Sequence, residues 1–120
     1  MRNSKHKIPH ISSKREKEAI TSFVKELRDK VGDDIVTIRL FGSKARGDSK
    51  KDSDIDIFIL LKKKNLEISD KIGEITANYI FDYNVPLSPV IYGLFEYRKN
   101  KELGSFFFEN VEKEGIPVWE

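Results

Sequence analysis

Two aspartates, Asp54 and Asp56, flank one isoleucine at the start of the apolar run in the stretch DSDIDIFILL. The run is rich in isoleucine and predicts a β-strand over residues 55–61. Successive side chains of a strand point to opposite faces, so both carboxylates lie on one face, about 7 Å apart. Phe58 and Leu60 continue that face, which indicates that the strand is covered on both sides and that the aspartates lie at the edge of a cleft.

The carboxylate pair has two interpretations. An isolated D-x-D is most often the solvent-exposed face of a strand. At the edge of a covered strand the two charges repel each other, which raises a pKa and lowers stability unless a cation binds between them. Oxygen ligands without a nearby thiolate or imidazole favour Mg²⁺ or Mn²⁺ over zinc. We therefore expect Asp54 and Asp56 to bind one of these ions.

A Gly-Ser pair, Gly42 and Ser43, precedes Asp54 with ten residues between them. Gly42 has no side chain, so a phosphate can approach the backbone, and Ser43 adds a hydroxyl donor. The next residues, with Lys44 and Arg46, could begin a short helix whose first amides point at an anion. The alternative is a turn with Ser43 as helix cap and two ordinary surface charges. We expect a phosphate-binding turn.

The elements that position these residues follow from periodicity. Their pattern predicts an α/β fold in which helices flank a small mixed β-sheet. In chain order we expect a helix capped at Ser13 and ending at Gly32, strands over 35–41 and 55–61, a helix over 66–81, an edge or bulged strand over 85–92 that contains Pro86 and Pro89, a helix through Leu103, Phe106, Phe107 and Val111 ending at Gly115, and a short closing strand or tail.

Length and composition limit the protein classes. The 120 residues, 38% of them hydrophobic, suffice for one domain, which we place at residues 14–120 after a basic flexible arm at residues 1–13. The net charge of +2 combines heavy charging of both signs and does not indicate a dedicated nucleic-acid binder. The sequence has no cysteine, no secretion signal and no apolar stretch of about 20 residues, so we expect a cytoplasmic protein that does not cross a membrane.

The whole segment LFGSKARGDSKKDSDIDIFIL resembles the signature of the minimal nucleotidyltransferases, small members of the DNA polymerase β-like superfamily. Their pattern is Gly-Ser, about ten residues, and Asp-x-Asp. The words ARGD and SDID match as well, and the closing EGIPVW resembles the end of these short proteins. The resemblance therefore extends over nearly all of the chain beyond the arm, and it implies the polymerase β-like nucleotidyltransferase fold.

The resemblance also implies a chemistry for these residues. Gly42 and Ser43, with Lys44 and Arg46, would bind the phosphates of a nucleoside triphosphate, with ATP as the expected nucleotide. Asp54 and Asp56 would be the catalytic residues and would bind Mg²⁺ or Mn²⁺. A hydroxyl would then attack the α-phosphorus and pyrophosphate would leave. Family members often act beside a helical HEPN-type partner protein as its antitoxin, which implies such a partner here.

One feature departs from the family pattern. The family site has a third carboxylate on a later strand, and the matching segment here, YNVPLSPVIY, contains no acid. Ser88 occupies the corresponding place, and a neutral hydroxyl is a poor Mg²⁺ ligand. Asp82 is the nearest acid in the sequence, with a helix-terminal surface charge as its simpler interpretation. Glu96 is a weaker candidate because it follows the strand.

Three classes of function stay open. The first is an active nucleotidyltransferase that modifies a protein hydroxyl, favoured by the two aspartates. The second is a nucleotide-binding or partner-binding module with little activity, favoured by the absent third acid. The third is a nucleic-acid binder that uses the arm and the lysine run Lys62 to Lys64, for which a solvated loop is the simpler interpretation.

Overall fold

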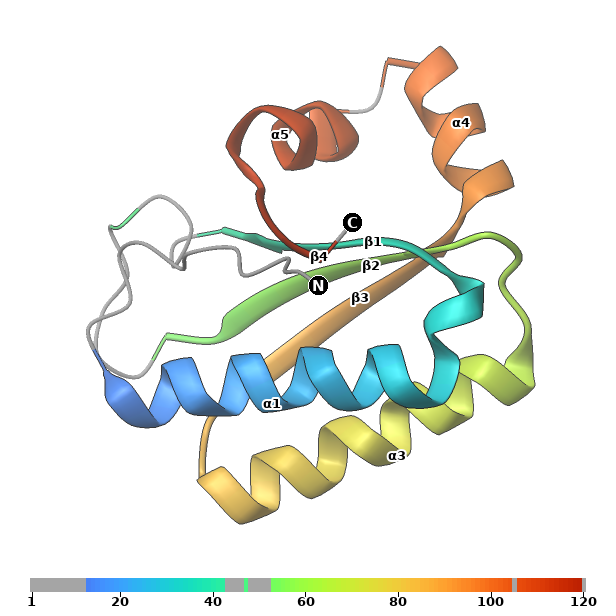
Figure 1. Ribbon diagram of the computed structural model, residues 1–120. Helices are drawn as coiled ribbons and strands as arrows, with labels where there is room; N and C mark the ends of the chain where they lie inside the picture. The colour runs from blue at the N-terminus through green and yellow to red at the C-terminus, as the bar shows by residue number, and fades with distance from the viewer. Residues whose placement is uncertain (1–12, 43–46, 48–52, 105, 120) are drawn as a thin grey trace.

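The computed structural model describes residues 13–42, 47, 53–104 and 106–119, so residues 1–12 of the predicted arm lie outside the described residues. Helices cover both faces of one sheet, which confirms the predicted α/β fold (Figure 1). The elements are α1 (Lys14–Val31), a 3-10 turn η1 (Gly32–Asp34), β1 (Ile35–Phe41), β2 (Ile55–Leu61), α3 (Leu66–Tyr83), β3 (Leu87–Gly93), α4 (Leu94–Glu102), α5 (Phe106–Glu114) and β4 (Ile116–Trp119).

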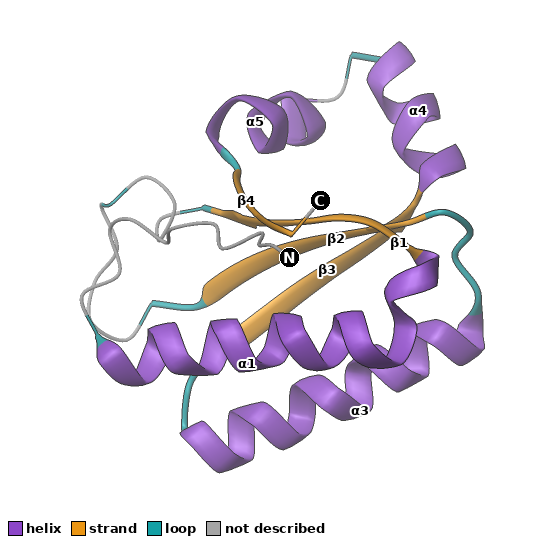
Figure 2. Ribbon diagram, in the orientation of Figure 1, coloured by secondary structure: helices purple, strands orange, loops and turns teal. Residues whose placement is uncertain are grey.

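The sheet has the strand order β3-β2-β1-β4 (Figure 2). β1 pairs antiparallel with β2 and β4, whereas β2 and β3 run parallel, so the sheet is mixed as predicted. The proline-containing segment forms the edge strand β3, with Pro89 opposite Ile57. The prolines predicted this edge position, because proline has no backbone N–H to donate to a second neighbouring strand. The closing segment is also a strand, β4.

Helices α1 and α3 cover one face of the sheet (Figure 1). α1 begins where the sequence predicted, because the Ser13 hydroxyl accepts a hydrogen bond from the Glu16 amide at 3.2 Å. Its apolar stripe, which includes Phe23 and Leu27, packs with the isoleucines of β2 in the main core. No helix in the described part of the chain combines the length and apolar character needed to cross a bilayer.

Two stacked tyrosines join α3 to α1. The rings of Tyr79 and Tyr83 lie 5.5 Å apart between centroids, and the Tyr79 hydroxyl donates to the carbonyl oxygen of Ser22 at 3.0 Å. Burial, followed by the neighbouring Glu26 carboxylate, raises the pKa of Tyr79 to about 12. The folded state therefore favours the protonated phenol at this position.

The Tyr79→Phe variant should lower the free energy of unfolding by about 1 kcal/mol near neutral pH, because the Ser22 carbonyl loses a donor. The pKa of Tyr79 rises from its ordinary 10.0 to about 12 on folding. The contribution of the Tyr79 hydroxyl to stability is therefore full below pH 10 and is lost as the pH rises toward 12. Urea unfolding at pH 8 and pH 11 measures both effects. Tyr83→Phe is the control, because its hydroxyl makes only a 3.5 Å contact with Ser22, and an equal loss there would contradict the assignment.

Helices α4 and α5 cover the opposite face (Figure 1). The prediction of a single helix through Leu103 was wrong, because α4 precedes α5 as a separate helix and Leu103 is an exposed cap residue. Gly104, with φ of +74°, ends α4 in the left-handed conformation that favours glycine. No side chain of α4 is fully buried, so the helix left no clear apolar period in the sequence. α5 supplies Phe108 and Val111 to a second core around Phe58 and Leu60.

Candidate functional site

Asp56 lies on a central strand, at the end of the sheet where β1 stops and β3 starts. Its register partners are Phe41 on β1 and Ser88 on β3. The side chain of Asp56 is half-buried, whereas Asp54, which lies just before the strand, is exposed. The carboxylate pair therefore stands at an accessible end of an otherwise buried strand.

Burial along β2 confirms that both faces of the strand are covered. Phe58 and Leu60 are 1% and 4% exposed and belong to the core beneath α4 and α5. Ile55 and Ile57 belong to the core beneath α1 and α3. Alternation then places Asp56 on the face of Phe58, beyond the part that the helices bury.

Gly42 packs directly against the carboxylate of Asp56. It has a φ of +76°, and a Cβ atom built on it would overlap Asp56 Oδ2. Only glycine fits this position without displacing the carboxylate. The structure therefore brings the glycine of the Gly-Ser turn to the second aspartate of the D-x-D pair. Ser43, Lys44 and Arg46 lie outside the described residues.

The sequence predicts that this site binds ATP with Mg²⁺, and the Gly42→Ala variant should weaken that binding by about tenfold or more. The same variant should lower the free energy of unfolding by about 1–2 kcal/mol. The stability loss comes from the left-handed backbone, and the binding loss comes from displacement of the Asp56 carboxylate. Gly104→Ala is the matched control, because Gly104 has φ of +74° and no atom within 4 Å of an added Cβ. Urea unfolding and calorimetric titration measure the two quantities, and equal ATP affinity in both variants would contradict the role of Gly42.

The two candidates for the third position lie on different sides of the sheet. Ser88 is the parallel register partner of Asp56, so its side chain lies on the same face as that of Asp56. Ser88 is half-buried there. Asp82 is exposed near the end of α3, and α3 packs on the opposite face. Glu96 lies at the start of α4, where its carboxylate accepts a hydrogen bond from the Gly93 amide at 3.2 Å. The geometry thus places Ser88, and neither acid, beside the carboxylate pair.

The donor set at this end of the sheet suits a hard cation. Asp54, Asp56 and Ser88 offer oxygen atoms, which Mg²⁺ and Mn²⁺ prefer. Within the described residues no group of three His, Cys, Asp or Glu side chains could hold a metal. An ion held by the two carboxylates would therefore take its remaining ligands from water and from the phosphates of a bound nucleotide.

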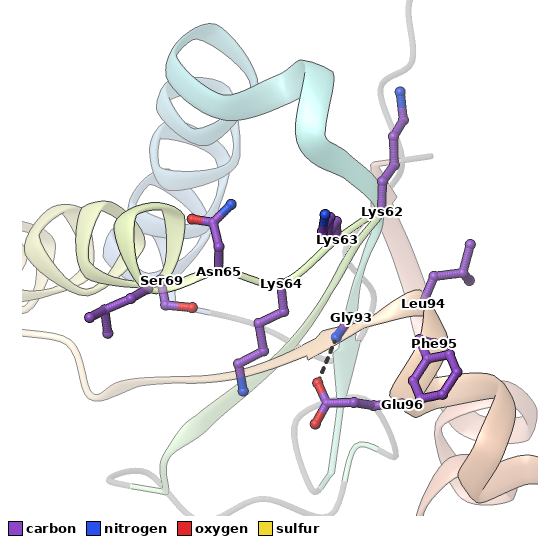
Figure 3. A pocket seen from close by; sticks show the side chains of 10 residues that line it. Lys62, Lys63, Lys64, Asn65, Ser69, Gly93, Leu94, Phe95 and Glu96 are labelled. Carbon is purple, nitrogen blue, oxygen red and sulfur yellow. Dashed lines mark hydrogen bonds between the residues drawn. The ribbon is translucent and has the colours of Figure 1, made fainter.

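Sequence reasoning missed a cavity of about 600 Å³ at the other end of the sheet, which Lys62, Lys63, Lys64 and Phe95 help to line (Figure 3). The sequence favoured a solvated loop for the lysine run. The signal in the sequence was the position of the lysine run, which ends directly before the start of a helix. Asn65 caps that helix, α3, by accepting a hydrogen bond from the Ile68 amide at 2.9 Å.

Comparison with known sequences gives the family. A family model described as a nucleotidyltransferase domain matches residues 20–115. A Methanocaldococcus jannaschii protein named as a protein adenylyltransferase is 34% identical over 102 residues, which cover 84% of this chain and 96% of the relative. A second protein of that name and organism is 33% identical over 108 residues, covering 83% and 94%.

Comparison with solved structures gives the fold. A crystal structure of a toxin-antitoxin with AMP-PNP superimposes with a TM-score of 0.58 at 23% identity, covering 82% of this chain and 72% of that chain. A structure of a minimal nucleotidyltransferase gives a TM-score of 0.57 at 22% identity, covering 88% and 97%. The chain therefore belongs to the nucleotidyltransferase domain family and has the polymerase β-like fold of its minimal members.

Proposed function

We propose that this protein transfers AMP from ATP to a hydroxyl group on a partner protein. The observation that carries the proposal is the packing of Gly42 against the Asp56 carboxylate. This contact supports the proposal, because glycine lets a phosphate approach the backbone and the carboxylate beside it is an oxygen ligand suited to the divalent cation that accompanies a triphosphate. Membership of the nucleotidyltransferase family supports the same reaction.

In this proposal the Gly42-Ser43 turn, with Lys44 and Arg46, holds the triphosphate, and Asp54 and Asp56 hold Mg²⁺ or Mn²⁺. The cation, when bound, compensates charge on the phosphate oxygens and lowers the pKa of the attacking hydroxyl. The acceptor oxygen forms a bond to the α-phosphorus while the bond from that phosphorus to the bridging oxygen of pyrophosphate breaks. The hydroxyl proton passes to solvent. The residues of the chain contribute mainly by orienting the triphosphate.

The proposed acceptor is a protein. Two relatives, each matched over more than nine-tenths of its own length, are named as protein adenylyltransferases. Two of the similar folds come from structures of a toxin-antitoxin, one of them with AMP-PNP. A role as an antitoxin that adenylylates a HEPN-type partner, as the sequence resemblance implies, fits both comparisons.

A second candidate function is a nucleotide-binding or partner-binding module with little transferase activity. The observation that favours it is Ser88, which lies beside Asp56 where the family pattern has a carboxylate. With only two carboxylates, nucleotide binding would survive while activation of the acceptor hydroxyl would be poor.

One labelling experiment separates the two functions. The protein is mixed with Mg²⁺, ATP labelled at the α-phosphate and any HEPN-type protein encoded beside it, and we expect label on the partner. ATP labelled at the γ-phosphate should give none, because pyrophosphate leaves. A stable complex that acquires no label would favour the binding module, and the absence of both complex and label would contradict both functions.

A further inference from the structure

The cavity of about 600 Å³ lies between the loop that joins β2 to α3 and the start of α4 (Figure 3). It is at the opposite end of β2 from the carboxylate pair. The distance along the strand from Asp56 to Lys62, at the rise of an extended chain, is about 20 Å. A ligand in this cavity is therefore not the nucleotide of the proposed transferase site, and its binding does not depend on transferase activity.

Three lysines of one loop line part of the cavity. Lys62, Lys63 and Lys64 are all exposed, and Lys62 and Lys64 extend in different directions (Figure 3). A Cβ atom on Gly93 would lie 3.1 Å from both the amide nitrogen and the Cβ of Lys64, so the lysine loop is packed tightly on the end of β3. Glu96 is the acidic residue among those that line the cavity, and its carboxylate accepts a hydrogen bond from the Gly93 amide.

Uncovered apolar side chains accompany the charge. Phe95 and Leu66 line the cavity and are 75% and 77% exposed. The hydroxyl oxygen of Ser69, at the first turns of α3, is shielded from solvent and has no hydrogen-bond partner. Figure 3 shows Lys64 between Ser69 on α3 and Glu96 on α4. An exposed aromatic ring beside several cations is the combination that binds a stacked base and its phosphate.

We propose that this cavity binds single-stranded nucleic acid, with a base stacked on Phe95 and successive phosphates contacted by Lys62, Lys63 and Lys64. Its volume is in the range that accommodates a nucleotide. Lysines that extend in different directions can contact successive phosphates of one strand, whereas a free nucleotide carries its phosphate group at one point. The exposed flat ring of Phe95 favours a base over an acidic peptide as the occupant.

The test measures binding of a fluorescent single-stranded RNA of about 12 nucleotides by anisotropy, in EDTA, so that the divalent cation of the transferase site is absent. The variant Lys62→Gln/Lys63→Gln/Lys64→Gln should bind more weakly, and its slope of log K against log salt should be smaller by about 2. The control Lys17→Gln/Lys25→Gln/Lys71→Gln removes the same charge from exposed helix positions and should bind as the parent does.

Phe95→Ala should weaken RNA binding by about 5- to 150-fold through loss of stacking. Phe81→Ala, which removes a ring that is 86% exposed on α3, should have no effect. Stabilisation by ATP and Mg²⁺ should be unchanged in the lysine and Phe95 variants, which separates this site from the transferase site. The proposal would be overturned if the parent did not bind RNA, or if the two triple variants lost affinity equally. It would also be overturned if Phe95→Ala bound RNA as the parent does, or if free AMP or polyglutamate competed as well as unlabelled RNA.

Discussion

The double variant Asp54→Asn/Asp56→Asn is expected to lose transfer of AMP by about 10³-fold or more and to lose stabilisation by ATP with Mg²⁺. Both carboxylates supply anionic oxygen to the proposed cation, and neutral amides of the same size cannot replace that charge. In the parent, ATP at a hundred times its Kd should add about 2.7 kcal/mol to the free energy of unfolding. In the double variant this increment should be close to zero.

Thermal unfolding with and without ATP and Mg²⁺ measures the increment, and α-labelled ATP measures the transfer. The matched control is Asp33→Asn/Asp34→Asn, which removes two neighbouring acids at the far end of β1. This control should respond to ATP and Mg²⁺ as the parent does. If the Asp33 and Asp34 variant also loses the response, the change in net charge, and not the loss of the two carboxylates at β2, explains the result. If the Asp54 and Asp56 variant keeps the response, the carboxylate pair is not the metal site.

The second large effect is expected from Ser88→Asp, which should raise the rate of AMP transfer by about tenfold or more. A positioned general base contributes typically about 10²- to 10⁴-fold, and a substituted carboxylate should recover part of that. The position is suitable because Ser88 and Asp56 are register partners on adjacent parallel strands, which lie about 4.8 Å apart. Mn²⁺ affinity should rise together with the rate.

Two controls accompany Ser88→Asp in the same assay. Ser88→Asn adds a side chain of similar size without charge and should give no gain. Asp82→Asn should leave transfer unchanged, because Asp82 is exposed on a helix that packs on the other face of the sheet. Rapid transfer by the parent that collapses in Asp82→Asn would show that Asp82 provides the third ligand and would contradict the interpretation of Ser88.

Local rules were sufficient for the parts of the fold that carry the carboxylate pair. Strand alternation alone puts Asp56 on the face of Phe58, and the burial of both faces of β2 follows from its unbroken apolar run. The start of α1 follows from a cap at Ser13. The position of Ser88 beside Asp56 could not be predicted from local rules, because the pairing of two distant strands has no local signature in the sequence. It was expected only from the family resemblance.

The rest of the fold could not be predicted for identifiable reasons. No side chain of α4 is fully buried, so periodicity does not mark this helix. The break at Gly104 was missed because Leu103 and Phe106 suggested one continuous apolar stripe. The cavity at Lys62 to Lys64 depends on β3 ending at Gly93 directly beside the lysine loop. Such an arrangement arises from the order of strands in the sheet and not from any stretch of sequence.

The proline of β3, Pro89, also affects how the protein behaves at high concentration. A strand at the margin of a sheet presents unpaired backbone groups that can recruit a strand from another molecule and start aggregation. Proline is tolerated in such a strand where its missing N–H faces outward, so Pro89 removes a donor from the open margin of β3. Replacing Pro89 would restore that donor, so the same residue that marks β3 as an edge strand protects it from edge-to-edge aggregation.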